Sequence, residues 1–329
     1  MILVRAPFRI SFVGGGSDLP AYYRRSAGGV VSTTIDKYMY IAIHPYFHSK
    51  IRVKYSRLED VERVEDIQHP IVRECLLRHQ IPKGMEIASF ADVPAGTGLG
   101  SSSAFTVALL HALNARRGQP SSPEELAVAA CQIEIDRLCE PIGKQDQYAS
   151  AYGGINFLRF HPDESVDVEP VAVELCIRQE FERRLLLFYV GQERSAGAIL
   201  AEQSQNMNNS MMLARVDAMV GLALQFRCAL EAGKLDDCGA LLHENWQLKR
   251  ALAEGVTSAE VDDVYARALA AGASGGKLLG AGTGGFLLLY CRPELQSGVR
   301  AALSSLRELP VALSSCGSQV IYSDEAMRQ

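Results

Sequence analysis

The sequence has no cysteine pair spaced for a metal, no long apolar run and no excess of positive charge. Its eight cysteines show no CxxC or CxxH spacing, which argues against a zinc site and favours reduced, buried thiols. The net charge of −5 gives the surface no general attraction for nucleic acid or an anionic membrane. No stretch approaches the roughly 20 apolar residues that span a bilayer, and Arg5 and Arg9 interrupt the apolar N-terminus. We therefore expect a cytoplasmic protein without a signal peptide that binds neither nucleic acid nor membrane.

The composition, 48% hydrophobic and 22% charged over 329 residues, is that of an ordinary globular protein. This length exceeds what one core usually carries, so two domains are expected. Gly191 separates a half in which strands and helices mix from a half that is mainly helical. We place the domains at residues 1–190 and 191–329. Strands mixed with helices without strict βαβ alternation predict an α+β fold.

Hydrophobic periodicity locates the expected elements. Strands are expected at 2–13, 38–47, 51–55, 85–91, 152–160, 184–190, 310–314 and 318–323. Helices are expected at 67–80, 101–118, 123–138, 194–207, 210–232, 236–253, 258–271 and 293–307. A glycine-rich stretch that becomes strand-like covers 277–291.

The segment PAGTGLGSSSA at residues 94–104 is the strongest local signal. Its glycines free the loop backbone, its serines add hydroxyl donors, and the helix that follows offers unpaired amides at its positive end. A glycine-rich turn with a serine cap is the alternative, but three glycines and three serines exceed what a cap needs. We expect this segment to bind phosphate through Pro94, Gly96, Thr97, Gly98, Leu99, Gly100, Ser101, Ser102 and Ser103.

Two other glycine-rich patterns do not fit the sites they suggest. The segment GGKLLG at 275–280 differs from a Walker A loop, because Leu278 follows Lys277 where Ser or Thr should hold magnesium. Residues 280–285 spell GxGxxG, but the strand-like FLLLYC follows instead of a helix. A dinucleotide would then have no helix terminus for its pyrophosphate.

Two acidic residues, Glu134 and Asp146, could serve phosphoryl transfer. Such a site needs a carboxylate for Mg²⁺ and often a second one to position or deprotonate the attacking hydroxyl. Taken alone, structural ion pairing explains such carboxylates better. The same holds for two other charged residues. Arg9, in an apolar strand, is explained as an ion-pair partner, and Asp18, after three glycines, as a turn residue.

Taken together, these segments resemble the galactokinase–homoserine kinase–mevalonate kinase–phosphomevalonate kinase (GHMP) family. Three motifs occur in the family's order. They are RAPFR through GGGSD at 5–18, residues 94–104, and GAGTGG at 280–285. The resemblance implies a two-lobed fold with an N-terminal lobe like ribosomal protein S5 domain 2 and a ferredoxin-like C-terminal lobe. ATP and the acceptor would bind between the lobes.

The resemblance also implies roles for single residues. Residues 96–103 would wrap the ATP phosphates, while Ser102 and Glu134 would hold Mg²⁺. Asp146 matches the family's catalytic aspartate, and Arg9 the basic residue beside it. The predicted acceptor-binding residues are Gly16, Ser17, Asp18, Gly282 and Thr283.

The first motif departs from the galactokinase pattern and looks like the branch that contains heptose 7-phosphate kinases and fucokinase-like enzymes. The implied reaction is transfer of the ATP γ-phosphoryl to the anomeric hydroxyl of D-glycero-D-manno-heptose 7-phosphate, for lipopolysaccharide or capsule precursors. The sequence leaves open another acceptor (fucose, another hexose or a mevalonate-like acid), a non-catalytic sugar or nucleotide sensor, and the oligomeric state, of which a homodimer is one option. An acceptor that carries a phosphate needs local basic residues, and Arg9, Arg24, Arg25, Lys37 and Lys50 are the candidates.

Overall fold

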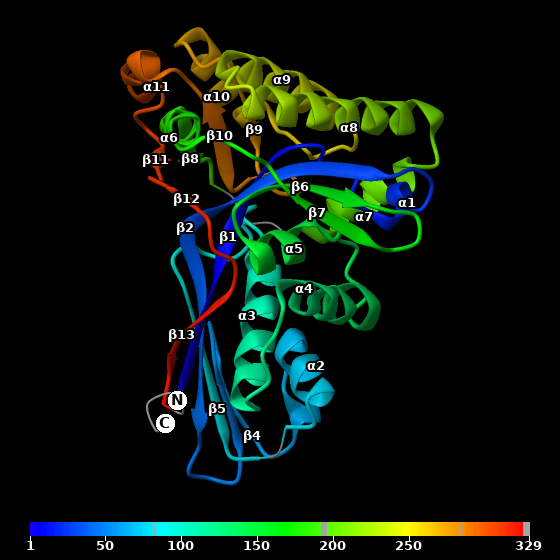
Figure 1. Ribbon diagram of the computed structural model, residues 1–329, viewed down its shortest axis with the longest axis vertical. Coiled ribbons are helices and arrows are strands. Elements are labelled where there is room, and N and C mark those ends of the chain that lie inside the picture. Colours follow the sequence, from blue (N-terminus) through cyan, green and yellow to red (C-terminus); the bar gives the residue numbers. More distant parts are fainter. Residues whose placement is uncertain (82, 192–195, 283, 325–329) are drawn as a thin grey trace.

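The computed structural model describes residues 1–81, 83–191, 196–282 and 284–324. Within these residues, nine strands form one sheet and four strands form a second, with helices packed on both (Figure 1). The α+β organisation expected from the sequence is therefore confirmed. No helix in the described part of the chain is long and apolar enough to cross a membrane.

The first sheet is built around two long antiparallel strands, β1 (Ile2–Val13) and β2 (Gly28–Pro45). Nearly every residue of β1 is buried, which accounts for its almost continuous apolar run. The central path runs β13-β1-β2-β5-β3-β4, while β6 and β12 also pair with β2, and β7 pairs with β6. The remaining strands are β3 (Ile51–Lys54), β4 (Leu58–Val61), β5 (Met85–Ala91), β6 (Ile155–Phe160), β7 (Val166–Pro170), β12 (Leu313–Ser314) and β13 (Gln319–Ser323).

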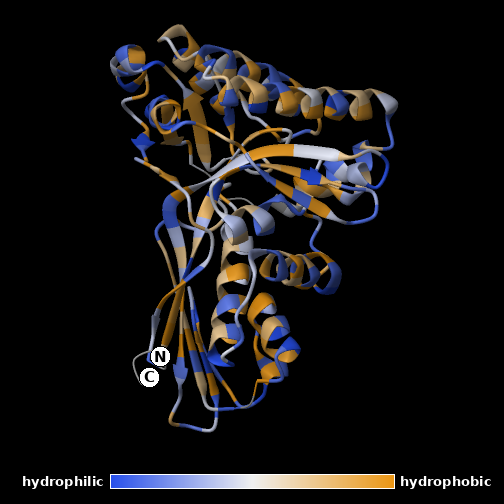
Figure 2. Cartoon of the chain, viewed as in Figure 1, coloured by the Kyte–Doolittle hydropathy of each residue, from blue (hydrophilic) through white to orange (hydrophobic). Residues whose placement is uncertain are grey.

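Helix α3 (Ser101–Arg116) packs on β1 and β2 and is buried along most of its length. Its small and apolar residues allow this close packing, and Figure 2 shows hydrophobic residues gathered where the lower helices face the sheet. The other helical segments of this half are α1 (Pro20–Tyr23), η1 (Val64–Asp66), α2 (Pro70–Arg78), α4 (Pro123–Cys131), η2 (Gln132–Arg137), α5 (Gln145–Tyr152) and α6 (Leu175–Arg183).

The second sheet has the order β11-β8-β10-β9, and its strand pairs are antiparallel. Its strands are β8 (Leu185–Tyr189), β9 (Gly275–Leu278), β10 (Phe286–Tyr290) and β11 (Arg307–Glu308). Helices α8 and α9 lie side by side above it in Figure 1, and α9 contacts β9. The helices of this half are α7 (Ala196–Asn206), α8 (Ser210–Glu231), α9 (Leu235–Lys249), α10 (Ala259–Ala270), η3 (Pro293–Leu295) and α11 (Gln296–Ala302).

The chain crosses between the two sheets more than once. Strand β8 belongs to the second sheet although it precedes residue 190, and β12 and β13 return to the first sheet, where β13 pairs with β1. Ile2 near the N-terminus therefore lies opposite Ser323. The division into residues 1–190 and 191–329 stays a prediction about folding units.

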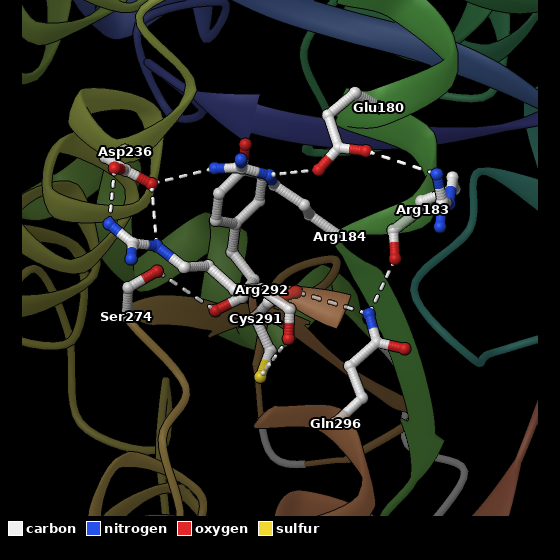
Figure 3. Close-up of polar contacts among 9 residues, drawn as sticks. Glu180, Arg183, Arg184, Asp236, Ser274, Cys291, Arg292 and Gln296 are labelled. Atoms are coloured by element: carbon white, nitrogen blue, oxygen red, sulfur yellow. Dashed lines mark hydrogen bonds and ion pairs between the residues drawn. The ribbon is translucent and has the colours of Figure 1, made fainter. Parts of the chain in front are cut away.

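A polar cluster joins elements around the second sheet (Figure 3). Asp236, near the start of α9, accepts hydrogen bonds from Arg184 at 2.8 Å and from Arg292 at 3.0 Å. Arg184 also donates to Glu180 on α6 at 3.0 Å. These contacts connect α6, the start of α9 and the segment after β10.

Most expected elements are present, and the differences have physical causes. The strand expected at 38–47 is the second half of the longer β2, whose first half, VVSTTI, carries three hydroxyl residues. The helix expected at 123–138 continues from Cys131 as the π-helical turn η2. Helix α6 was not expected, because its apolar residues cover only a narrow face.

Candidate active site

The glycine-rich segment forms a loop that ends directly on α3. Gly96, Gly98 and Gly100 have φ angles of 75°, 85° and 75°, a region that L side chains rarely adopt. Gly100 is the N-cap of α3 and contributes no side-chain cap, so the first amides of the helix remain open. Open amides and a glycine backbone at this helix end are what the phosphate site predicted from the sequence would need, and phosphate binding itself stays a prediction.

The GAGTGG segment packs directly on this loop. A Cβ on Gly98 would lie 2.4 Å from the Leu279 carbonyl oxygen, and a Cβ on Gly280 would lie 2.6 Å from the Gly98 Cα. The Thr97 carbonyl also accepts a hydrogen bond from the Phe286 amide at 3.2 Å. Since β10 begins at Phe286, the pattern is followed by a strand, as the sequence indicated. These glycines allow two backbones to meet, and no helix terminus follows them.

Arg9 and Asp146 form a bidentate ion pair at the centre of the site. The Arg9 Nε and Nη2 atoms donate to the two Asp146 carboxylate oxygens, both at 2.7 Å. The third guanidinium nitrogen, Nη1, donates to the Gly98 carbonyl. Arg9 is buried on β1, whereas the Asp146 side chain, in the first turn of α5, retains 23% exposure. The pair therefore links the glycine-rich loop at 94–100 (the phosphate loop of the prediction) to a carboxylate that a ligand can reach.

Glu134 is a second carboxylate, buried on the π-helical turn η2. Its oxygens accept hydrogen bonds from the Ser102 hydroxyl at 2.7 Å and from the Gln147 amide at 2.8 Å. Burial raises the pKa of Glu134 to about 7, although these hydrogen bonds act in the opposite direction. The π-turn puts this carboxylate opposite the start of α3.

The Ser102 and Glu134 pair fits a magnesium ion that is held partly by ATP. Mg²⁺ binds through one or two protein oxygens together with waters and substrate phosphates. Within the described ranges, no three His, Cys, Asp or Glu side chains gather into a cluster that could hold a metal ion. A buried carboxylate with a raised pKa is an oxygen donor that a cation would stabilise in its charged form.

The loop at 14–18 forms the opposite wall of the site. Asp18 is almost fully buried and accepts a hydrogen bond from the Gly16 amide at 2.9 Å. Burial raises the pKa of Asp18, with a smaller contribution from Asp146. The hydroxyl of Ser17 donates to the Gly14 carbonyl at 2.8 Å, and its oxygen accepts from the Gly29 amide at 3.0 Å. Ser17 thus holds the loop in shape, whereas Gly16 and Asp18 face the cleft.

The walls enclose a cleft of about 330 Å³, the size of a small-molecule site. The predicted residues that line it are Arg9, Gly16, Asp18, Gly96, Gly98, Gly100, Ser101, Ser102, Ser103, Asp146 and Gly282. The other predicted loop residues, Pro94, Thr97 and Leu99, shape the loop from behind: Thr97 donates to the Pro94 carbonyl, and Leu99 is in the core. Thr283 lies outside the described residues.

Besides the exposed Glu140, the sequence did not single out four buried or half-buried polar residues that also line the cleft: Ser11, Gln145, Gln203 and Lys249. They come from β1, α5, α7 and α9. Lys249 is buried at a position that helical periodicity assigns to the inner face of α9, and so is Asn245 one turn before it. Polar residues at core positions of an amphipathic helix were the signal that could have identified this face.

The basic residues expected to meet an acceptor phosphate mostly lie elsewhere. Arg24 pairs with Glu164 at 2.6 Å, and Lys37 pairs with Asp36 at 2.8 Å. Neither these two nor Arg25 and Lys50, all four of them described, belong to the cleft lining, while Arg9 does. Of the five candidates, Arg9 therefore lines the cleft and the other four do not: three of them have partners of their own, and Lys50 is in the β2–β3 turn.

Comparisons with known proteins identify the family of the chain. The family model "GHMP kinases N terminal domain" matches residues 69–154, and "GHMP kinases C terminal" matches residues 226–309. A D-glycero-alpha-D-manno-heptose 7-phosphate kinase of Campylobacter jejuni is 28% identical over 92% of this chain and 93% of its own. An L-fucokinase/L-fucose-1-P guanylyltransferase of Bacteroides fragilis is 27% identical over 97% of this chain and 38% of its own.

Solved structures give the same result for the fold. The crystal structure of a D-glycero-D-manno-heptose 1-phosphate kinase from Bacteroides thetaiotaomicron superimposes with a TM-score of 0.80 at 25% identity, covering 98% of this chain and 100% of its own. The two-lobed fold implied by the resemblance is thereby confirmed. The chain belongs to the GHMP kinases, the ATP-dependent phosphotransferases that act on an alcohol group.

Proposed function

We propose that this kinase transfers the ATP γ-phosphoryl to the anomeric hydroxyl of D-glycero-D-manno-heptose 7-phosphate, for lipopolysaccharide or capsule precursors. The observation that carries the proposal is the Arg9–Asp146 pair, which joins the phosphate loop to an accessible carboxylate in a cleft of small-molecule size. The heptose assignment is supported by the relatives that are named as heptose phosphate kinases.

The nucleotide phosphates would lie on the amides of residues 96–103 at the N-terminus of α3, where the helix dipole favours negative charge. Ser102 and Glu134 would hold Mg²⁺, which neutralises charge on the phosphates when bound. Because the 280–285 segment packs on Gly98, it would cover the phosphates from the other side.

The acceptor would occupy the part of the cleft beside Asp18. Three buried atoms there have no hydrogen-bond partner among the described residues: Ser11 Oγ, Gln145 Oε1 and Gln203 Nε2. Buried polar groups are costly unless they are satisfied, so this wall is suited to a ligand with many hydroxyl groups. A sugar meets that requirement better than a short hydroxy acid.

Asp146 would accept a hydrogen bond from the attacking hydroxyl and orient it toward the γ-phosphorus. Arg9 donates to both carboxylate oxygens, which fixes the direction of the carboxylate. Catalysis of this kind depends mainly on positioning and on charge stabilisation.

A panel of acceptors tests the proposal through kcat/KM with saturating ATP and Mg²⁺. The panel contains heptose 7-phosphate, heptose 1-phosphate, unphosphorylated heptose, L-fucose and galactose. We expect heptose 7-phosphate to be used best. A preference for fucose, supported by the fucokinase relative, would replace the heptose assignment with a free-sugar 1-kinase. If none of these acceptors is phosphorylated, the assignment as a sugar kinase is refuted.

A further inference from the structure

Lys249, in the last turn of α9, is a buried cation that lines the cleft. Only 6% of the residue is exposed, and its Nζ donates to the Gly280 carbonyl at 2.7 Å. No carboxylate oxygen of the described residues lies within 4.0 Å of that nitrogen. An ammonium group has three donors, so most of its hydrogen-bonding capacity faces the cleft unused.

No carboxylate of the described residues forms an ion pair with Lys249, although Asp18 and Asp146 act on it from a greater distance and raise its pKa. Asp146 is engaged by Arg9 on β1, and Asp18 accepts from the Gly16 amide. Lys277 on β9 is fully buried, has no partner among the described residues, and has a pKa far below its ordinary value because of burial. Burial and Arg9 lower the pKa of Lys249 to about 8, so it remains mostly protonated at neutral pH. A buried, unpaired ammonium is costly, and an anionic ligand would offset that cost.

The position of Lys249 identifies which anion would reach it. Its Nζ lies 3.8 Å from the place that a Cβ on Gly15 would occupy, in the loop at 14–18 where the acceptor is proposed to bind. Its acceptor Gly280 belongs to the segment that touches the phosphate loop at Gly98. Lys249 therefore bridges the nucleotide side and the acceptor side of the cleft, on the path between them.

We propose that Lys249 is a catalytic residue that donates to the oxygens of the phosphoryl group during its transfer. The proposal rests on the proposed function. The acceptor hydroxyl oxygen forms a bond to the γ-phosphorus, while the bond between that phosphorus and the β–γ bridging oxygen breaks. The electron pair of the broken bond stays on ADP, and the hydroxyl proton passes to Asp146. Lys249 keeps its protons throughout. Its positive charge is already in place beside the phosphoryl oxygens, where negative charge is redistributed during the transfer.

The test compares Lys249→Met and Lys249→Arg with Lys234→Met, a matched change at an exposed residue just before the same helix. We expect Lys249→Met to lower kcat by about 10²–10³, the loss typical when one preorganised donor is removed. The KM values for ATP and acceptor should change less than threefold, and Lys234→Met should match the parent. Thermal unfolding should show Lys249→Met at least as stable as the parent, since it removes a buried unpaired charge.

The pH profile separates a catalytic charge from a packing role. The parent kcat/KM for the acceptor should decline above about pH 8 as Lys249 loses its proton. Lys249→Arg should retain measurable activity and lack that decline. The pH dependence is measured with the acceptor that the parent uses best.

Three results overturn the inference and leave the kinase assignment standing: unchanged kcat in Lys249→Met, a rise confined to the acceptor KM, or an alkaline decline that persists in Lys249→Arg. If the parent itself transfers phosphate to none of the acceptors, the proposed function fails first.

Discussion

Replacing Glu134 by Gln removes a buried carboxylate while keeping its shape. In the protein the pKa of Glu134 is raised to about 7 from an ordinary 4.5, because the side chain is buried. A carboxyl whose pKa is raised by folding favours the folded state only while it is protonated. Its contribution is fully present below pH 4.5 and is lost as the pH rises through 7. Metal-free protein should therefore be destabilised by this group at alkaline pH.

The magnitude follows from the difference between the two pKa values. A shift from 4.5 to about 7 corresponds to a cost of about 3 kcal/mol at pH 8.5 and about 1 kcal/mol at pH 5.5. Glutamine can be accommodated at this position. The Gln147 Oε1 atom has no partner, so a flip of the Gln147 amide would let it accept from the new amide nitrogen. The variant should therefore avoid most of the free-energy cost of burying the charged Glu134 carboxylate.

Urea unfolding of parent and Glu134→Gln, both in EDTA, measures the difference. We expect the variant to be more stable, with a gap that widens by about 2 kcal/mol between pH 5.5 and pH 8.5. Its Mg²⁺ titration of kinase activity should shift to higher metal concentration. A variant that is less stable than the parent at every pH, with an unchanged Mg²⁺ titration, would show that Glu134 is a structural partner of Ser102 and Gln147.

Three further predictions concern the loop, the aspartate and the acceptor. Asp146→Asn should lower kcat by about 10²–10⁴ with little change in ATP affinity, and near-normal turnover would exclude a catalytic role. Gly98→Ala, whose Cβ would meet the Leu279 carbonyl oxygen at 2.4 Å, should weaken ATP binding at least tenfold. Its control is Gly118→Ala, which has φ +64° and open space around the new Cβ and should only reduce stability; equal ATP affinity in both variants would contradict the role of the loop contact. Deleting the 7-phosphate of the heptose should lower kcat/KM at least tenfold if two charge-assisted contacts hold it, and equal values would mean that a free sugar is the acceptor.

The elements that carry strong periodicity or turn chemistry could be predicted from the sequence. The helix after the SSS segment begins at Ser101 as expected, and the apolar N-terminal strand spans residues 2–13. Both depend on local sequence features. Glycines before the serines end the loop where the helix begins, and the continuous apolar run defines the strand. The π-turn at Glu134 was not predictable, since nothing in QIEIDR distinguishes it from an ordinary helical turn.

Cleft-lining residues were predicted where they belong to motifs and missed where they belong to plain helices, and the roles of the predicted residues stay predictions. Arg9, Asp146, Ser102 and Glu134 lie together as the resemblance implied. Lys249 reaches the same site from α9, more than 100 residues away along the chain. The polar residues at core positions of α9 mark an unusual helix face, but which site that face reaches depends on how the two sheets pack.

The identity of the product tests the account most directly. Purified protein is incubated with ATP, Mg²⁺ and heptose 7-phosphate, and phosphorus NMR follows the mixture. We predict a new anomeric phosphate signal that grows in equal amount with ADP while the 7-phosphate signal is retained. ADP that accumulates with free inorganic phosphate, or a new phosphate at any position other than the anomeric oxygen, would contradict the account.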